Sequence, residues 1–221
     1  MIRKLLVSFY LLSVSVSAQK HDFQSMLECH TSSEKPGVVV RIEQNGKLVF
    51  SGAAGVANIG TLKPLQVDQV FQIGSVTKQF TAAAILQLLE NKKLSLNDTL
   101  GDFIPNINSE YTKLSLERVL NHTSGLPNYN TDANIRSKWD KYTPIDDVVE
   151  IVSQMPIHSE PGEEYYYSNT GYVLLGKVIE VASGLSYSEY MQKNIFSPLK
   201  MSNTYVISKG ESSGQVIGYS G

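Results

Sequence analysis

The sequence predicts an α+β fold, and two kinds of pattern support this prediction. A β-hairpin is predicted near the N-terminus, where two runs rich in β-branched residues, GVVVRIEQ from Gly37 and KLVFSGAAG from Lys47, are joined by Asn45-Gly46. Farther along the chain, several segments carry apolar residues at helical spacing. We therefore expect an antiparallel sheet that starts with this hairpin, followed by a set of helices.

The helices are predicted from apolar periodicity and from capping residues. A well-buried helix is expected from about Ser75 to Glu90. Ser168 is expected to cap a helix over 169–183, which Gly184 terminates. Residues 70–73 are interpreted as a short strand. Further helices are expected over 114–121, 144–154 and 187–196.

Residues 1–18 are predicted to be a signal peptide. A basic start precedes an apolar run from Leu5 to Val16, and small residues then fit a cleavage site after Ala18. A membrane anchor is the alternative, but the run is shorter than the roughly 20 residues that a spanning helix needs. The protein is therefore expected to be exported, periplasmic or secreted, without a stable membrane span after cleavage. Residues 19–35 are expected to form a leader segment or a short helix.

Charge and cysteine content argue against several classes of function. Lys and Arg number 19 against 21 Asp and Glu, so the net charge of −2 creates no positive field that would attract nucleic acid. The single cysteine, Cys29, rules out an intramolecular disulfide. The four histidines show no metal-ligand spacing. Neither a metal nor a cofactor is expected, and the oligomeric state is left open.

A candidate nucleophile lies in the segment Gly74-Ser75-Val76-Thr77-Lys78. A lysine three residues after a serine at a helix start shares the helix face with it, and its neutral amine can accept the serine proton. The same S-x-x-K spacing occurs at Ser32 and at Ser197, and a helix-capping role is the alternative for Ser75. Of these serines, only Ser75 has a glycine before it and a long apolar helix after it.

A second candidate element is Tyr167-Ser168-Asn169, at the start of another predicted helix. A tyrosine between a lysine and the scissile bond can carry a proton to the leaving group. An asparagine can bind the lysine amine and a substrate amide at once, because it has both a donor and an acceptor. The alternative is an aromatic patch followed by a helix cap at Ser168.

These elements and their flanking residues resemble a known family. Three segments carry the resemblance, in this order: GSVTKQFTAAAILQLLENKKLSLNDTLGDFIP, LNHTSGLP and EPGEEYYYSNTGYVLLGKVIE. They resemble the serine β-lactamases and penicillin-binding proteins, the family that joins class C β-lactamases, DD-carboxypeptidases, and related esterases and D-aminopeptidases. The resemblance runs from about Pro36 to Tyr205. It implies a β-lactamase/transpeptidase-like fold, with an antiparallel sheet flanked by helices, a helical subdomain, and the serine between them.

The resemblance also implies roles for particular residues. Ser75 would be acylated, Lys78 would activate it, and Tyr167 would relay a proton. Asn169 would contact Lys78 and the substrate amide. The implied function is that of a serine hydrolase, which acts through an acyl-enzyme on a β-lactam, a D-amino-acid peptide or a small ester. Two further residues of the resembling segments are interpreted as structural: His122 and Ser124.

One departure from the family pattern concerns the C-terminal side of the chain. The family closes its site with a late strand that carries Lys-Thr-Gly or His-x-Gly, and nothing like it follows Tyr167. Residues 36–221 are therefore expected to be a partial domain of this fold, truncated at the C-terminus. Two alternative functions follow: a non-catalytic homologue that binds penicillin or peptidoglycan, and an inactive fragment.

Overall fold

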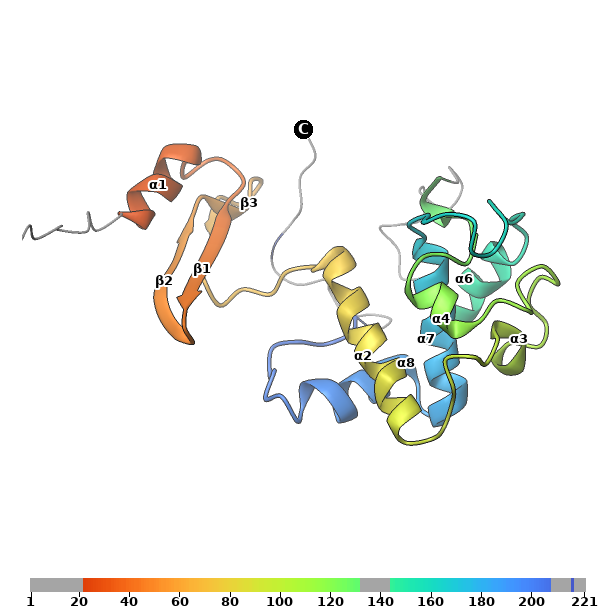
Figure 1. Cartoon of the computed structure of the whole chain (residues 1–221). Coiled ribbons are helices and arrows are strands. Elements are labelled where there is room, and N and C mark those ends of the chain that lie inside the picture. The colour runs from red at the N-terminus through yellow and green to blue at the C-terminus, as the bar shows by residue number, and fades with distance from the viewer. Residues whose placement is uncertain (1–21, 132–143, 208–215, 217–221) are drawn as a thin grey trace, which may run out of the picture. The chain divides into compact units, whose positions relative to one another are not determined.

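The computed structural model describes residues 22–131, 144–207 and 216 (Figure 1). These residues divide into two units: the first contains residues up to Gln69 together with Val216, and the second begins at Val70. The predicted signal peptide, residues 1–18, lies outside the described residues. No helix in the described ranges is long and apolar enough to cross a membrane. The division into a leader and a partial domain stays a prediction.

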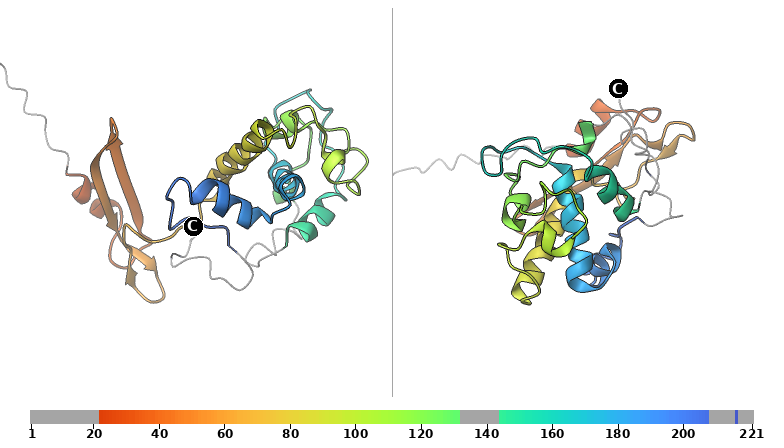
Figure 2. Two further views of the ribbon diagram at one scale, coloured as in Figure 1. Left: turned by 90° about the horizontal axis from the view of Figure 1, so that it is seen from below. Right: turned by 90° about the vertical axis from the view of Figure 1, so that its right-hand side faces the viewer.

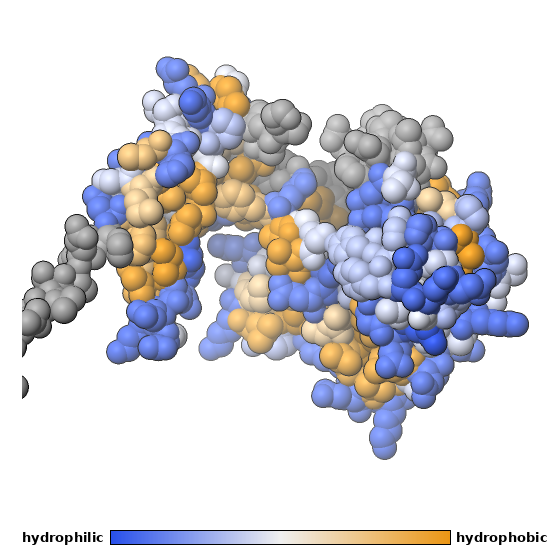
Figure 3. Space-filling view, turned by 45° about the horizontal axis from the view of Figure 1, so that its top comes forward, coloured by the Kyte–Doolittle hydropathy of each residue, from blue (hydrophilic) through white to orange (hydrophobic). Residues whose placement is uncertain are grey.

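The predicted hairpin forms the centre of the first unit. Strand β1 (Val38–Gln44) pairs antiparallel with β2 (Lys47–Ala54). The two linking residues, Asn45 and Gly46, have φ angles of 52° and 72°. Positive φ at both positions is what a two-residue type I′ turn requires, and Asn-Gly adopts it at little cost. The hairpin is therefore confirmed, and hydrophobic side chains remain at the surface of its unit (Figure 3).

A short helix precedes the hairpin, and a second small sheet follows it. Helix α1 (Phe23–His30) packs on β2, where the ring centroids of Phe23 and Phe50 are 5.3 Å apart. Strand β3 (Val56–Asn58) pairs antiparallel with β4 (Lys63–Pro64). Of the two alternatives for the segment before the hairpin, the structure thus contains the short helix.

The second unit is helical, and α7 (Asn169–Ser183) lies at its centre (Figure 2). Ser168 caps α7 by accepting a hydrogen bond from the N–H of Gly171 at 3.2 Å, and Gly184 ends it with a left-handed φ of 73°. Both termini are as predicted. The helices packed against α7 are α2 (Thr77–Glu90), α3 (Leu100–Phe103), α4 (Leu116–Leu120), α6 (Ile145–Val152) and α8 (Tyr187–Met191).

Helix α2 begins after a 3-10 turn, Gly74–Val76, so Ser75 lies in this turn and not within the α-helix. Tighter turns of this kind are frequent at helix termini. The helix occupies its predicted place, but only one of its faces is buried. Ile85 is fully buried, whereas Leu86 is 47% exposed. The expectation of a well-buried helix therefore holds for one side of α2.

Two local expectations differ from the structure. Residues 70–73 form no strand, because they have no pairing partner among the described strands. An apolar run becomes a strand only where a neighbour satisfies its backbone groups.

The polar stretch after α2 contains α3, which the sequence analysis missed. Its signal is a capping box, in which Thr99 and Asp102 each accept a hydrogen bond from the other's backbone N–H.

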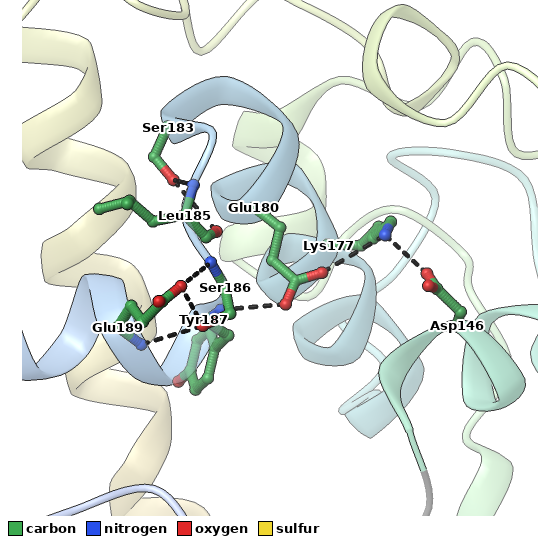
Figure 4. A network of polar contacts seen from close by, with 8 residues as sticks. All are labelled: Asp146, Lys177, Glu180, Ser183, Leu185, Ser186, Tyr187 and Glu189. Carbon is green, nitrogen blue, oxygen red and sulfur yellow. Dashed lines mark hydrogen bonds and ion pairs between the residues drawn. The ribbon is translucent and has the colours of Figure 1, made fainter.

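A network of polar contacts links α7 to its neighbours (Figure 4). Glu180 of α7 accepts hydrogen bonds from the N–H of Tyr187 at 2.9 Å and from the ammonium of Lys177 at 3.3 Å. Lys177 also contacts Asp146 of α6 at 2.6 Å. The hydrogen bond from Tyr187 to Glu180 sets the turn between α7 and α8. Helix α8 then continues into a π-helical turn over Gln192–Phe196. The network therefore fixes how three helices meet.

Adjacent positions on α2 provide a matched test of its one-sided burial. Ile85→Ala should lower the free energy of unfolding by about 2–5 kcal/mol, because it leaves a cavity in the core. Leu86→Ala should lower it by about 1 kcal/mol or less, because that side chain is already half in water. Urea unfolding followed by circular dichroism measures both values. Equal losses would contradict the burial described above.

Candidate active site

The four predicted site residues lie together within the helical unit. Ser75 lies in the turn before α2, and Lys78 lies in the first turn of that helix. Tyr167 directly precedes the cap of α7, and Asn169 is the first residue of α7. Because α2 packs against α7, the starts of the two helices come close enough for side-chain hydrogen bonds. Residues about 90 positions apart in the chain thus form one cluster.

The hydroxyl of Ser75 is contacted by two other groups of this cluster. The phenol of Tyr167 donates a hydrogen bond to Ser75 Oγ at 2.7 Å. The ammonium of Lys78 donates to the same oxygen at 3.3 Å. Both distances are within or near the range for direct proton transfer. Ser75 is also an exposed residue.

Lys78 is held by neutral groups. Its ammonium donates a hydrogen bond to Asn169 Oδ1 at 2.5 Å. It also lies 4.7 Å from the ring centroid of Tyr167 and 5.4 Å from that of Tyr172, within the range of cation–π attraction. The amide nitrogen of Asn169 donates to Asn128 Oδ1 at 3.3 Å. Asn128 therefore orients the Asn169 amide so that its oxygen faces Lys78.

The ionisation of Tyr167 is shifted by its surroundings. Burial raises the pKa of Tyr167, but the neighbouring Lys78 ammonium and the Ser75 hydroxyl lower it by more. The net result is a pKa below the usual value of 10.0. A positive charge and a hydrogen-bond donor both stabilise a phenolate. Tyr167 is therefore better suited to proton transfer than an isolated tyrosine.

The other two S-x-x-K matches lie in different surroundings. The N–H of Lys35 donates to the carbonyl of Ser32 at 3.1 Å, and the N–H of Lys200 donates to that of Ser197 at 3.0 Å. Both pairs therefore span turns and do not start a helix. In the part of the chain that the structure describes, no group of three or more His, Cys, Asp or Glu side chains could hold a metal ion.

Two contributors to the site were missed by the sequence analysis. Asn128 follows directly after the segment LNHTSGLP, and Tyr172 lies three residues after Asn169 on α7. The helical spacing would have placed Tyr172 on the face of Asn169, whereas the role of Asn128 depends on how its loop folds. Ser124, interpreted as structural, is 2% exposed, and its oxygen accepts from the N–H of Leu126 at 3.4 Å.

Comparison with known proteins shows the family to which the chain belongs. The family model described as Beta-lactamase matches residues 23–218. The chain belongs to the beta-lactamase family. The predicted resemblance to serine β-lactamases and penicillin-binding proteins is thereby confirmed, and family members are serine hydrolases. The penicillin-binding protein 4* of Bacillus subtilis (strain 168) is 32% identical over 195 residues, which cover 86% of this chain and 42% of that relative.

Solved structures support the predicted α+β fold class. An octameric penicillin-binding protein homologue from Pyrococcus abyssi has a TM-score of 0.69 and 33% identity, and the match covers 82% of this chain and 42% of that one. A D-amino acid amidase from Ochrobactrum anthropi SV3 has a TM-score of 0.70 and 29% identity, covering 80% of this chain and 48% of that one. The chain thus spans less than half the length of these family members.

The contact between Lys78 and Tyr167 can be tested by titration. With tyrosine labelled at the ring carbon that bears the oxygen, NMR should show Tyr167 ionising below pH 10. Lys78→Met should raise this pKa, because a positive charge that stabilises the phenolate is lost. Tyr167→Phe identifies the resonance. An unchanged pKa in the Lys78→Met variant would show that Lys78 does not act on the phenol.

Proposed function

We propose that this chain carries the nucleophile of a serine hydrolase that works through an acyl-enzyme at Ser75. The observation that supports the proposal best is the position of the Ser75 oxygen, which lies 2.7 Å from the Tyr167 phenol and 3.3 Å from the Lys78 nitrogen. Both partners can accept or return a proton. A helix-capping serine, the alternative for Ser75, has no need for such partners.

The reaction then proceeds in two steps. In the first, Ser75 Oγ attacks the carbonyl carbon of the substrate while its proton passes to the neutral amine of Lys78. The bond from that carbon to the leaving nitrogen or oxygen breaks, and the leaving atom receives a proton through Tyr167. In the second step, water attacks the acyl carbon, which releases the acid and restores the Ser75 hydroxyl.

Asn169 binds both the lysine and the substrate in this proposal. Its oxygen accepts the hydrogen bond from Lys78, and one hydrogen of its amide nitrogen goes to Asn128. That nitrogen carries two hydrogens, so the second can bind a substrate carbonyl. A β-lactam, a D-amino-acid peptide or amide, and a small ester all present a carbonyl with a nitrogen or oxygen leaving group. The similarity to a penicillin-binding protein and to a D-amino acid amidase supports the first two of these substrate classes.

The nucleophile can be tested by labelling with a fluorescent penicillin and mass mapping of the modified residue. The chain should form an adduct on Ser75, and Ser75→Ala should abolish it. Ser32→Ala and Ser197→Ala are matched controls, because each removes the serine of another S-x-x-K match, and labelling should be unchanged. Equal labelling of the Ser75→Ala variant would exclude Ser75 as the nucleophile.

The same experiment separates the alternative functions. Release of the labelled acid with recovery of free Ser75 supports a hydrolase, whereas an adduct that persists supports a penicillin-binding homologue without turnover. A D-amino-acid amide and a p-nitrophenyl ester, tested in parallel, show which leaving group is used. Absence of turnover and of any adduct would identify an inactive fragment. The measurements should be made on this chain and on any longer gene product that contains it.

Export to the periplasm or the medium is a further part of the proposal, and it rests on the sequence of residues 1–18. Peptidoglycan-like substrates lie outside the cytoplasm, which agrees with export. The mature protein should begin at Gln19, and mass spectrometry of the exported product would show this. A product that keeps residues 1–18 and remains with the membrane would instead support the anchor alternative.

A further inference from the structure

His122 holds the chain on both sides of Tyr167. The N–H of Tyr166 donates to the carbonyl oxygen of His122 at 2.9 Å. The N–H of Ser168 donates to Nδ1 of the His122 ring at 3.2 Å. The left-handed backbone of His122, with φ of 63°, turns its carbonyl and its ring toward the same segment. The residue between these two contacts is Tyr167.

The ring of His122 also packs against the ring of Tyr167. Their centroids are 4.7 Å apart with an interplanar angle of 35°. The same imidazole lies 5.1 Å from the ring of Tyr172 and 5.8 Å from that of Tyr165. His122 therefore restrains Tyr167 through the backbone before it, the backbone after it, and the ring itself.

The hydrogen bond from Ser168 fixes the protonation state of His122. Because Nδ1 accepts an N–H, the ring must be neutral and must carry its proton on Nε2. Protonation would add a hydrogen to Nδ1, where it would face the N–H of Ser168. Two donors cannot share this contact, so the segment that carries Tyr167 would have to move.

The burial of His122 and the charge of Lys78 favour the neutral ring. Lys78 faces it from α2, Tyr165 and Tyr167 from the segment before α7, and Tyr172 from α7. Burial lowers the pKa of His122, and the positive charge of Lys78 lowers it further, so the pKa lies below 6.5. The ring is thus neutral at pH 7 and becomes charged only in more acidic solution.

We propose that His122 is a positioning residue, which holds Tyr167 against Ser75 as a neutral imidazole and releases it when protonated. This proposal rests on the proposed function, since it concerns the tyrosine of that reaction. Acylation should then slow as the pH falls below about 6.5. The loss is geometric, because the hydrogen bond from the N–H of Ser168 cannot form once Nδ1 carries a hydrogen.

The substitution that tests this role is His122→Asn. Asparagine tolerates a positive φ, and its side-chain oxygen can replace Nδ1 as the acceptor for Ser168. The variant should therefore fold, while it loses the ring contact and cannot titrate. His158→Asn is the matched control, because His158 stacks on the ring of Tyr166 at 3.7 Å but makes neither contact that brackets Tyr167.

The readout is the ratio of wild-type to variant acylation rates between pH 5 and pH 8. For His122→Asn this ratio should be about tenfold or more near pH 7.5, since small displacements of a catalytic group cost rate, and it should fall as His122 becomes protonated in the wild type. Dividing the rates removes any pH dependence that both proteins share. The ratio for His158→Asn should stay near one. A ratio for His122→Asn that does not change with pH would overturn the proposal.

A double-mutant cycle shows whether His122 acts through Tyr167. His122→Asn should slow acylation in the wild type but have little further effect in a Tyr167→Phe background, where the phenol is already absent. Equal effects in the two backgrounds would show that His122 acts elsewhere, and the positioning role would be wrong.

NMR of histidine labelled with nitrogen-15 tests the local arrangement without any reaction. His122 should show the Nε2–H tautomer at pH 7.5 and a pKa below 6.5. The His122→Asn variant assigns its signals, and a shifted Tyr167 ring resonance in that variant reports the lost contact. If the NMR results are as expected but the chain does not acylate, the proposed function is wrong while His122 still positions Tyr167. An Nδ1–H tautomer would overturn the positioning role itself.

Discussion

The packing of α7 against α2 is the constraint on which the candidate site depends. Leu174, Leu175, Val178 and Ile179 of α7 are fully buried, as is Ile85 of α2. Hydrophobic burial is not directional, so this contact alone would allow several relative positions of the two helices. Two polar contacts that reach α2 restrict those positions: Lys78 donates to Asn169 Oδ1 at 2.5 Å, and the hydroxyls of Thr81 and Tyr187 are 2.7 Å apart. The reacting groups can therefore lie at helix starts, where Ser75 and Tyr167 are exposed, while the helices themselves are held by an apolar core.

Lys78 has an unusual set of partners for a lysine that is partly buried. It contacts a hydroxyl, an amide oxygen and two aromatic rings. A carboxylate beside a lysine favours the ammonium form, and in the described ranges no ion pair involves Lys78. These neutral partners hold the side chain in place beside Ser75. The same arrangement places its charge beside Tyr167 and His122, where it lowers both pKa values.

Local sequence was sufficient where the structure depends on neighbouring residues. The Asn45-Gly46 turn and the caps of α7 were predictable because the required backbone angles and hydrogen bonds involve residues within a few positions. The strand expected at 70–73 was wrong because an apolar run does not specify its partner. The burial of α2 was predicted too broadly for a related reason: periodicity shows which side chains are apolar, not what covers them.

The candidate site shows the same boundary between local and tertiary information. The sequence by itself determined the family, the pairing of Ser75 with Lys78 on one helix start, and the residue types of the second element, because these follow from short spacings and from long matching segments. Only the tertiary structure placed Tyr167 on the Ser75 oxygen, turned Asn169 toward Lys78 through Asn128, and bracketed Tyr167 with His122. Each of those contacts joins residues more than 40 positions apart, and their geometry is set by helix packing that no single segment encodes.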